Sequence, residues 1–424
     1  MIMSYTQTIS SLLENLFEKS IKAPTQLLFK KSKPKDGVYQ VLQRLINTKS
    51  NTSRVKYAKD FFAEVDLLSD AEFKNFMLHL RDQRDIDTEL LKLCTENYIN
   101  DDSEINYIKL QEVLTTERKD LFRKLNCFDE STIHLVNLRK RILANSTTNQ
   151  NFQKVEHDLK TLFIDWFNRG FLILKPIDWN TPASILEKII KYESVHQINN
   201  WRELRDRIDS HDRKCFAFFH PAMATEPLIF VEIAFLDKMP NKINTILDTH
   251  RNMLSESEAN TAVFYSISNC QRGLDGISFG NFLLKEVVTF IEKEIPNIKN
   301  FITLSPVPRF MTWLKTHDTD LHTAIMASPQ TENISKYEKQ LNIHIRDYLL
   351  ISKREDQKPN DPVSRFHLGN GASLHRINFM ADTSKNNLLK SASFMVNYKY
   401  DNKNIEKNHE QYTKHNRVIV RKNI

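Results

Sequence analysis

The chain has 424 residues and a mass of 49.9 kDa, which exceeds one ordinary domain and predicts two or three. Hydrophobic residues make up 40% and charged residues 27%, so a large core can be buried and disorder is not the default expectation. No run approaches the ~18 apolar residues that a membrane helix needs, so we expect no membrane-spanning segment.

The net charge of +7 is a mild excess, which suits a polyanionic small ligand or a weak nucleic-acid binder and decides between neither. We interpret the basic stretch 30–35 as a solvated loop and expect no nucleic-acid partner. The first twenty residues carry Glu14 and Glu18 and lack a compact apolar stretch, so we expect no secretory signal and a cytoplasmic location. Four widely spaced cysteines show no zinc or disulfide pattern and are expected to be ordinary thiols: Cys94, Cys127, Cys215 and Cys270.

Residues 1–168 predict an all-helical domain. No glycine or proline occurs from Val38 to Arg169, and polar turns at 100–103 and 145–149 separate apolar stretches. Apolar side chains recur at the i, i+3, i+4, i+7 spacing of a buried helix face at 9, 12, 13 and 16 and at 159, 162, 163 and 166. No cluster of His, Cys or paired carboxylates indicates chemistry here, so we expect this domain to serve homo-oligomerisation or support.

Residues 169–424 predict a mixed α/β domain with a polar, basic tail after about residue 401. Gly170 is typical of the end of the last helix of the first domain. Short apolar runs predict strands at 215–219, 228–236, 261–267 and 300–304. Helices are predicted at 280–294 and 308–315. The order is that of an α+β fold in which a strand enters a helix through a glycine turn.

Glycine is scarce in this chain, and five of the seven glycines fall within 273–280 and 369–371. The first group, Gly273, Gly276 and Gly280, is neither a dinucleotide fingerprint nor a P-loop. Its layout resembles the pyrophosphate-binding turn of the GNAT (acetyltransferase-like) fold, in which backbone N–H groups at a helix start hold coenzyme A. The register would place Asp275, Ser278 and Gly280 at the three marked positions, of which only Gly280 fits well. A purely structural turn is the alternative.

Two further positions carry candidate chemistry. His367 stands just before the second glycine group, where a turn can present an imidazole to a pocket. Neither it nor His375 has a carboxylate or cysteine at metal spacing, so we predict no metal. Ser305 follows a predicted strand and precedes Pro306 and Pro308, which fix the backbone. The alternative for Ser305 is a plain helix start, with the serine as N-cap and Pro306 at the first helical position.

These pieces together, in this order, closely resemble the malonyl-CoA decarboxylase family. The motifs that carry the resemblance lie within 168–401 and are Ala262-Val-Phe-Tyr-Ser-Ile-Ser268, Gln271-x-Gly-Leu-x-Gly276, Phe301-x-x-Leu-Ser-Pro-Val-Pro308, Phe366-His-Leu-x-Asn-Gly-Ala372 and Arg376-Ile-Asn-x-Met-Ala-Asp382. The helical region has the size of the family's helical oligomerisation domain.

The resemblance implies a GNAT-like catalytic domain that converts malonyl-CoA to acetyl-CoA and CO2, with Ser305 and His367 as the catalytic pair. It implies that the substrate's coenzyme A part binds a segment consisting of Asp275, Gly276, Ile277, Ser278, Phe279, Gly280 and Asn281. Ser266 and Tyr400 match positions that line or support the pocket. Some family members carry a carboxylate at the position of Ser278, so an acid/base role there does not transfer.

The chemistry needs no cofactor, because the thioester carbonyl is itself the electron sink. We expect an enolate, stabilised by an oxyanion hole and protonated by the Ser/His pair. Two alternatives remain at this point. One is a GNAT-type acyl-CoA acyltransferase, and the other is a non-enzymatic helical scaffold with a degenerate ligand domain.

Overall fold

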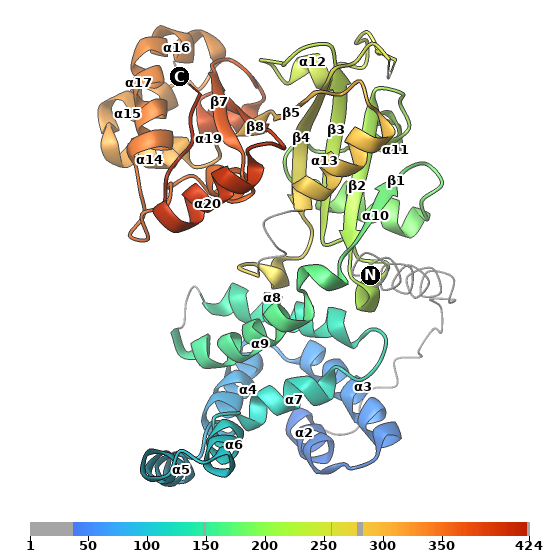
Figure 1. The fold of residues 1–424 in the computed structure, drawn as a ribbon, viewed down its shortest axis with the longest axis vertical. Coiled ribbons are helices and arrows are strands. Elements are labelled where there is room, and N and C mark those ends of the chain that lie inside the picture. The colour runs from blue at the N-terminus through green and yellow to red at the C-terminus, as the bar shows by residue number, and fades with distance from the viewer. Residues whose placement is uncertain (1–36, 147–149, 256, 278–282, 422–424) are drawn as a thin grey trace. The chain divides into compact units, whose positions relative to one another are not determined.

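The computed structural model describes residues 37–146, 150–255, 257–277 and 283–421 (Figure 1). These residues divide into two compact units. The first takes those within Met1–Ile173, Phe219–Glu226 and Gln271–Phe279, and the second takes those within Leu174–Phe218, Pro227–Cys270 and Gly280–Ile424. Two short segments of the C-terminal half, 219–226 and 271–277, therefore pack with the helical region rather than with the sheet. The predicted division at residue 168 stays a prediction.

The described part of the first unit up to residue 167 is helical, as predicted. Its helices are α2 (Val38–Asn47), α3 (Asn51–Leu67), α4 (Asp70–Gln83), α5 (Thr88–Asn100), α6 (Glu104–Val113), α7 (Glu117–Leu125), α8 (Ser131–Ser146) and α9 (Gln153–Trp166). Polar residues start several of them, and Ser69 and Glu72 form a complete capping box at α4. The predicted stripe on α9 is confirmed, since Leu159 and Phe163 are fully buried. The stripe at 9–16 lies outside the described residues.

The second unit is built on one mixed sheet with the order β1-β2-β3-β4-β5-β8-β6, and β7 pairs with β8. Its strands are β1 (Ile173–Ile177), β2 (Arg213–Phe219), β3 (Ile229–Leu236), β4 (Thr261–Asn269), β5 (Asn300–Thr303), β6 (Ser305–Pro306), β7 (Ser373–Asn378) and β8 (Met395–Tyr400). The strands β4 and β5 are parallel, with Phe264 opposite Thr303, and the chain between them forms α13 (Leu283–Glu294). This is the strand, turn and helix arrangement that the GNAT-like prediction requires.

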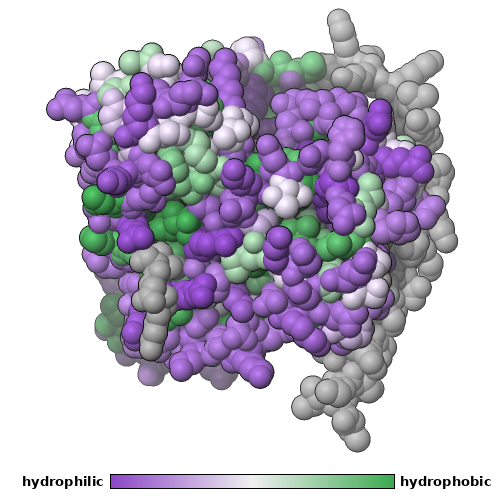
Figure 2. Space-filling model, turned by 90° about the horizontal axis from the view of Figure 1, so that it is seen from above, coloured by the Kyte–Doolittle hydropathy of each residue, from purple (hydrophilic) through white to green (hydrophobic). Residues whose placement is uncertain are grey.

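The sheet is covered on both faces, which explains the continuous apolar runs of its central strands. Every residue of β3 is buried. Helix α13 packs on one face, where the rings of Phe216 and Phe290 meet edge to face at 5.1 Å. The other face is a cluster of buried side chains that includes Val263, Ile302 and Met395. The face of the molecule shown in Figure 2 is largely hydrophilic, and its apolar side chains lie in small separate areas.

Several elements were not predicted from the sequence. They are α10 (Ala183–Tyr192), α11 (Trp201–Ile208), α12 (Asn244–Leu247), α15 (Thr319–Met326), α16 (Thr331–Lys336), α17 (Glu338–Arg346), α18 (Pro362–Gly369), α19 (Lys385–Ser391) and α20 (Ile405–His415). The predicted helix at 308–315 is α14 (Phe310–His317). The basic tail contains α20, whose Ile405 and Tyr412 are buried. The α+β fold class, a helical region followed by a mixed α/β domain, is confirmed.

Candidate functional site

The two residues predicted as the catalytic pair lie within hydrogen-bonding distance of each other. Ser305 Oγ and His367 Nε2 are 3.0 Å apart, although 62 positions separate them in the sequence. Both side chains are buried, with relative exposures of 6% and 2%. A buried hydroxyl beside an imidazole is the arrangement found where a proton is moved to or from a reacting atom.

The sheet, not a helix, positions Ser305. The dipeptide Ser305–Pro306 is the short strand β6, in which Ser305 pairs with Val396 of β8. The next helix begins only at Phe310, so the alternative of Ser305 as an N-cap is wrong. Pro306 lacks an N–H and is tolerated because β6 ends the strand order of the sheet.

Helix α18 positions His367 in its last turn. Asp361 caps the N-terminus by accepting the backbone N–H of Ser364 at 2.7 Å, and Pro362 occupies the first helical position. The ring of Tyr398 stacks on the imidazole, with the centroids 4.7 Å apart and the planes at 23°. The Tyr398 hydroxyl in turn bonds to Ser364 Oγ, which ties the stacked ring back to α18. The imidazole is thus held from its face and from its helix.

Tyr400, predicted as a supporting residue, contacts the other nitrogen of the imidazole. Its hydroxyl lies 2.8 Å from His367 Nδ1. On the far side, Ser305 Oγ donates to Thr303 Oγ1 at 2.9 Å, and Thr303 Oγ1 donates to the Val396 carbonyl at 3.4 Å. One placement of the hydrogen atoms gives every donor in this network an acceptor: Tyr400 donates to Nδ1, and Nε2–H donates to Ser305. The network therefore favours the Nε2–H tautomer of His367.

Burial sets the charge of this network. It lowers the pKa of His367 to about 3, because desolvation penalises the imidazolium. It also raises the pKa of Tyr400 well above its usual value. The Ser305, His367 and Tyr400 side chains are thus all neutral at physiological pH. Any proton that leaves this network comes from a neutral donor.

The sequence reasoning missed two residues that hold the pair in place. Thr303 accepts both the Ser305 hydroxyl and, at 3.0 Å, the backbone N–H of Tyr398. Asn397 donates from Nδ2 to the Thr303 carbonyl at 2.7 Å. Thr303 lies two residues before Ser305, where side chains of an extended segment share a face, and this spacing could have identified it. Asn397 belongs to a distant strand, and the residue spacing around Ser305 does not predict its contact with Thr303.

Ser266, predicted to line or support the pocket, belongs to a different buried cluster. Its hydroxyl lies 2.9 and 2.8 Å from the two Glu193 carboxylate oxygens, and Ser268 Oγ lies 3.3 Å from one of them. The backbone N–H groups of Val195 and His196 donate to the same carboxylate. Among the described residues, no hydrogen bond joins Ser266 to the Ser305/His367 pair. Its visible role is to fasten β4 to the chain that follows α10.

The first glycine group forms a tight turn in the helical unit. Asp275, with φ −57° and ψ 132°, and Gly276, with φ +75°, are the central residues of a type II turn, closed by a 3.0 Å bond from Ile277 N–H to the Leu274 carbonyl. Gly276 is needed for that positive φ. The predicted site residues Ser278, Phe279, Gly280 and Asn281 lie outside the described residues.

Gly273 is required by a neighbouring helix. A Cβ at Gly273 would lie 2.0 Å from the carbonyl oxygen of Val136 in α8. This glycine therefore allows η4 (Arg272–Leu274) to pack closely on α8. In the second glycine group, Gly371 has φ +82° and a Cβ there would lie 2.3 Å from the Ile405 carbonyl, whereas Gly369 meets only an ordinary contact. Gly371 thus lets α20 pack behind the end of α18.

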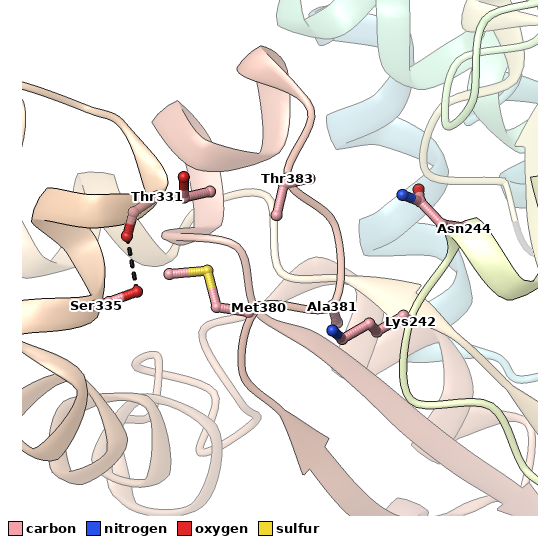
Figure 3. A pocket seen from close by; sticks show the side chains of 7 residues that line it. All are labelled: Lys242, Asn244, Thr331, Ser335, Met380, Ala381 and Thr383. Carbon is pink, nitrogen blue, oxygen red and sulfur yellow. Dashed lines mark hydrogen bonds between the residues drawn. The ribbon is translucent and has the colours of Figure 1, made fainter.

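A separate open pocket of about 280 Å³ lies in the sheet unit (Figure 3). Its lining residues are Lys242, Asn244, Thr331, Ser335, Met380, Ala381 and Thr383. None of the predicted site residues lines it.

The four cysteines are thiols, three buried and one half-buried, as predicted. Within the described ranges, no group of three or more His, Cys, Asp or Glu side chains has a metal-site arrangement, and no helix is long and apolar enough to cross a bilayer.

Both parts of the chain match known protein families. Residues 170–424 match the malonyl-CoA decarboxylase C-terminal domain, and residues 85–167 match the malonyl-CoA decarboxylase N-terminal domain. The chain belongs to the malonyl-CoA decarboxylase family. The resemblance predicted from the sequence motifs is confirmed.

Individual members of this family agree over most of the chain. The crystal structure of malonyl-CoA decarboxylase from Rhodopseudomonas palustris is 39% identical, with a TM-score of 0.86 over 91% of this chain and 97% of that one. The structure from Agrobacterium vitis is 38% identical, with a TM-score of 0.84 and the same coverage. The mouse protein named malonyl-CoA decarboxylase, mitochondrial, is 31% identical over 69% of this chain and 67% of its own length. The chain is an enzyme of this family, so the alternative of a non-enzymatic scaffold is wrong.

Proposed function

We propose that this protein decarboxylates malonyl-CoA to acetyl-CoA and CO2 at the site formed by Ser305, His367 and Tyr400. The observation that carries the proposal is the continuous hydrogen-bonded network in which Ser305 Oγ meets His367 Nε2 at 3.0 Å and Tyr400 meets Nδ1 at 2.8 Å. Three buried, neutral donors in a row suit a reaction whose product must gain a proton on carbon.

The reaction balances without an added electron carrier. The bond between the malonyl carboxylate and C2 breaks, CO2 leaves, and the electron pair moves onto the thioester oxygen to give an enolate. The enolate then takes one proton at C2 and becomes the acetyl thioester. Fixed donors aimed at the thioester oxygen stabilise the developing charge, and each such donor is typically worth about 100- to 1000-fold in rate.

In this proposal Ser305 and His367 divide two tasks between them. One delivers the proton to C2 and the other positions the thioester. Because burial lowers the pKa of His367 to about 3, the imidazole donates to Ser305 as a neutral Nε2–H and not as an imidazolium. Tyr400 keeps that proton on Nε2 by donating to Nδ1. The network regains its proton from solvent after each turnover.

We further propose that the coenzyme A part of the substrate binds the turn Asp275, Gly276 and Ile277 and the segment 278–281 that follows it. The Gly276 N–H is not used in the backbone bonds that close the turn and can meet a phosphate oxygen. No cofactor enters the proposed reaction, because the thioester accepts the electron pair itself.

The deciding experiment measures CO2 and acetyl-CoA released from malonyl-CoA with EDTA present and no acyl acceptor. We expect equal amounts of both products, and a loss of kcat of about 100-fold or more in Ser305→Ala and His367→Asn. Ser335→Ala and His344→Asn are matched controls, since neither side chain bonds to the pair. Binding of coenzyme A without release of CO2 would move the function to acyl transfer. Normal turnover in both site variants would contradict the assigned roles.

We also propose that the chain forms a homo-oligomer through the hairpin of α5 and α6. Only Cys94 is buried on α5, and no residue of α6 is buried. Large apolar side chains project from both helices, among them Ile99 at 76% exposure and Ile105 at 66%. An apolar face of this kind marks an interaction site, and a second copy of the same hairpin offers a matching surface.

A further inference from the structure

The type II turn at Asp275 and Gly276 is anchored by a buried arginine of the helical unit. Arg139 of α8, whose side chain is 1% exposed, donates from Nη1 to the Gly273 carbonyl at 2.7 Å and from Nη2 to the Asp275 carbonyl at 2.9 Å. Glu156 of α9 accepts from Nη2 at 2.6 Å and from Nε at 3.1 Å. The turn is therefore built on an ion pair between two helices.

This anchor also aims the turn. The Asp275 carbonyl and the Gly276 N–H belong to the same trans peptide, so they point in opposite directions. Since Arg139 holds the carbonyl, the Gly276 N–H points away from the guanidinium. The residue is exposed at this point. The buried arginine thus presents a backbone donor outward.

A second positive charge reaches the same turn from α9. The Lys160 ammonium lies 3.7 Å from the position that a Cβ on Gly276 would take. Across the described residues, no hydrogen bond or ion pair engages this ammonium, although carboxylates are common on α9. Burial raises the pKa of Asp275, and the positive charges of Arg139 and Arg272 oppose this rise. Arg272 thus adds positive charge at the turn. Lys160 and Arg272 together outweigh the single Asp275 carboxylate.

We propose that Lys160 is a phosphate-binding residue for coenzyme A, acting with the Gly276 N–H on the turn that Arg139 orients. The inference rests on the proposed function, because it names a contact to the same substrate. A lysine at a backbone N–H is a usual partner for a phosphate oxygen. The helical unit then contributes directly to substrate binding, in addition to any role in self-association.

The test separates phosphate binding from chemistry. Lys160→Ala should raise KM for malonyl-CoA about 10-fold, which corresponds to about 1.4 kcal/mol, and leave kcat unchanged. With malonyl-pantetheine, which has no pyrophosphate and no ribose phosphate, kcat/KM should be the same for the variant and the unmodified protein. Lys160→Arg should restore most of the KM. Lys154→Ala is the matched control, because it removes the same charge from α9 at a lysine that pairs with Asp85 and not with the turn.

Two comparisons identify which phosphate Lys160 binds and distinguish failure of this inference from failure of the proposed function. An effect that persists with malonyl-dephospho-CoA assigns Lys160 to the pyrophosphate, and one that disappears assigns it to the ribose phosphate. Calorimetric binding of coenzyme A gives a readout without turnover. If the unmodified protein binds coenzyme A but releases no CO2, the proposed function fails while this inference can still hold. The inference is wrong if Lys160→Ala binds coenzyme A as tightly as Lys154→Ala does. It is also wrong if the substitution lowers kcat/KM for malonyl-pantetheine as much as it lowers kcat/KM for malonyl-CoA.

Discussion

Replacing Tyr400 by phenylalanine tests whether its hydroxyl supports His367 through the hydrogen bond to Nδ1. The substitution keeps the buried ring and removes one oxygen, the one that lies 2.8 Å from Nδ1. Nδ1 then has no donor in a site where the imidazole is almost fully buried. An unpaired buried polar group costs about 1–3 kcal/mol. The imidazole therefore loses about that much stabilisation at Nδ1, whichever nitrogen carries the proton.

This cost translates into a defined loss of rate. About 1.4 kcal/mol is a factor of ten, so we expect kcat for CO2 release to fall about 5- to 150-fold. KM should change little, because Tyr400 bonds to the imidazole and not to the coenzyme A part. Nitrogen chemical shifts of the imidazole, measured by NMR on labelled protein, should show that the Nδ1 resonance has moved, because Nδ1 has lost its hydrogen bond.

The control for this experiment is Tyr398→Phe. That ring also packs on His367, but its hydroxyl bonds to Ser364, so the variant loses a buried hydrogen bond without touching a nitrogen of the imidazole. It should lose stability and keep kcat near the value of the unmodified protein. A folded Tyr400→Phe protein with normal kcat and unchanged nitrogen shifts would refute the hydrogen-bond network deduced from the structure.

Four other measurements follow from the structure. kcat should stay level from about pH 8 to about pH 5, because burial lowers the pKa of His367 to about 3, and a step near about 6.5 would indicate an exposed histidine. The same shift should cost folding stability as pH falls below about 6.5, since the unfolded imidazole then binds a proton that the folded one excludes. Gly371→Ala should destabilise by more than about 2 kcal/mol in thermal unfolding, whereas Gly369→Ala should be tolerated, and equal Tm values would contradict the packing argument. Ile105→Glu should shift the protein to a smaller species in sedimentation, while the equally exposed Ile343→Glu should leave the size unchanged.

The sequence by itself determined the main elements of the fold. Period-3.6 apolar spacing and the lack of glycine and proline predicted the helical region, and short β-branched runs predicted β2 to β5. These patterns are local, so they can be recognised without knowing which other elements each helix or strand packs against. The sequence motifs also identified the family and, through it, Ser305 and His367. It could not predict β6 or β8, because a two-residue strand such as Ser305–Pro306 exists only through its pairing with Val396.

Only the tertiary structure decided what the individual side chains do. It separated Ser266, which serves the Glu193 cluster, from Tyr400, which bonds to His367, although both were predicted as supporting residues. It also showed that Gly273 is demanded by the approach of helix α8. The physical reason is common to these cases. Hydrogen bonds and close packing join residues far apart in the chain, and the spacing of residue types carries no record of which distant partners they meet.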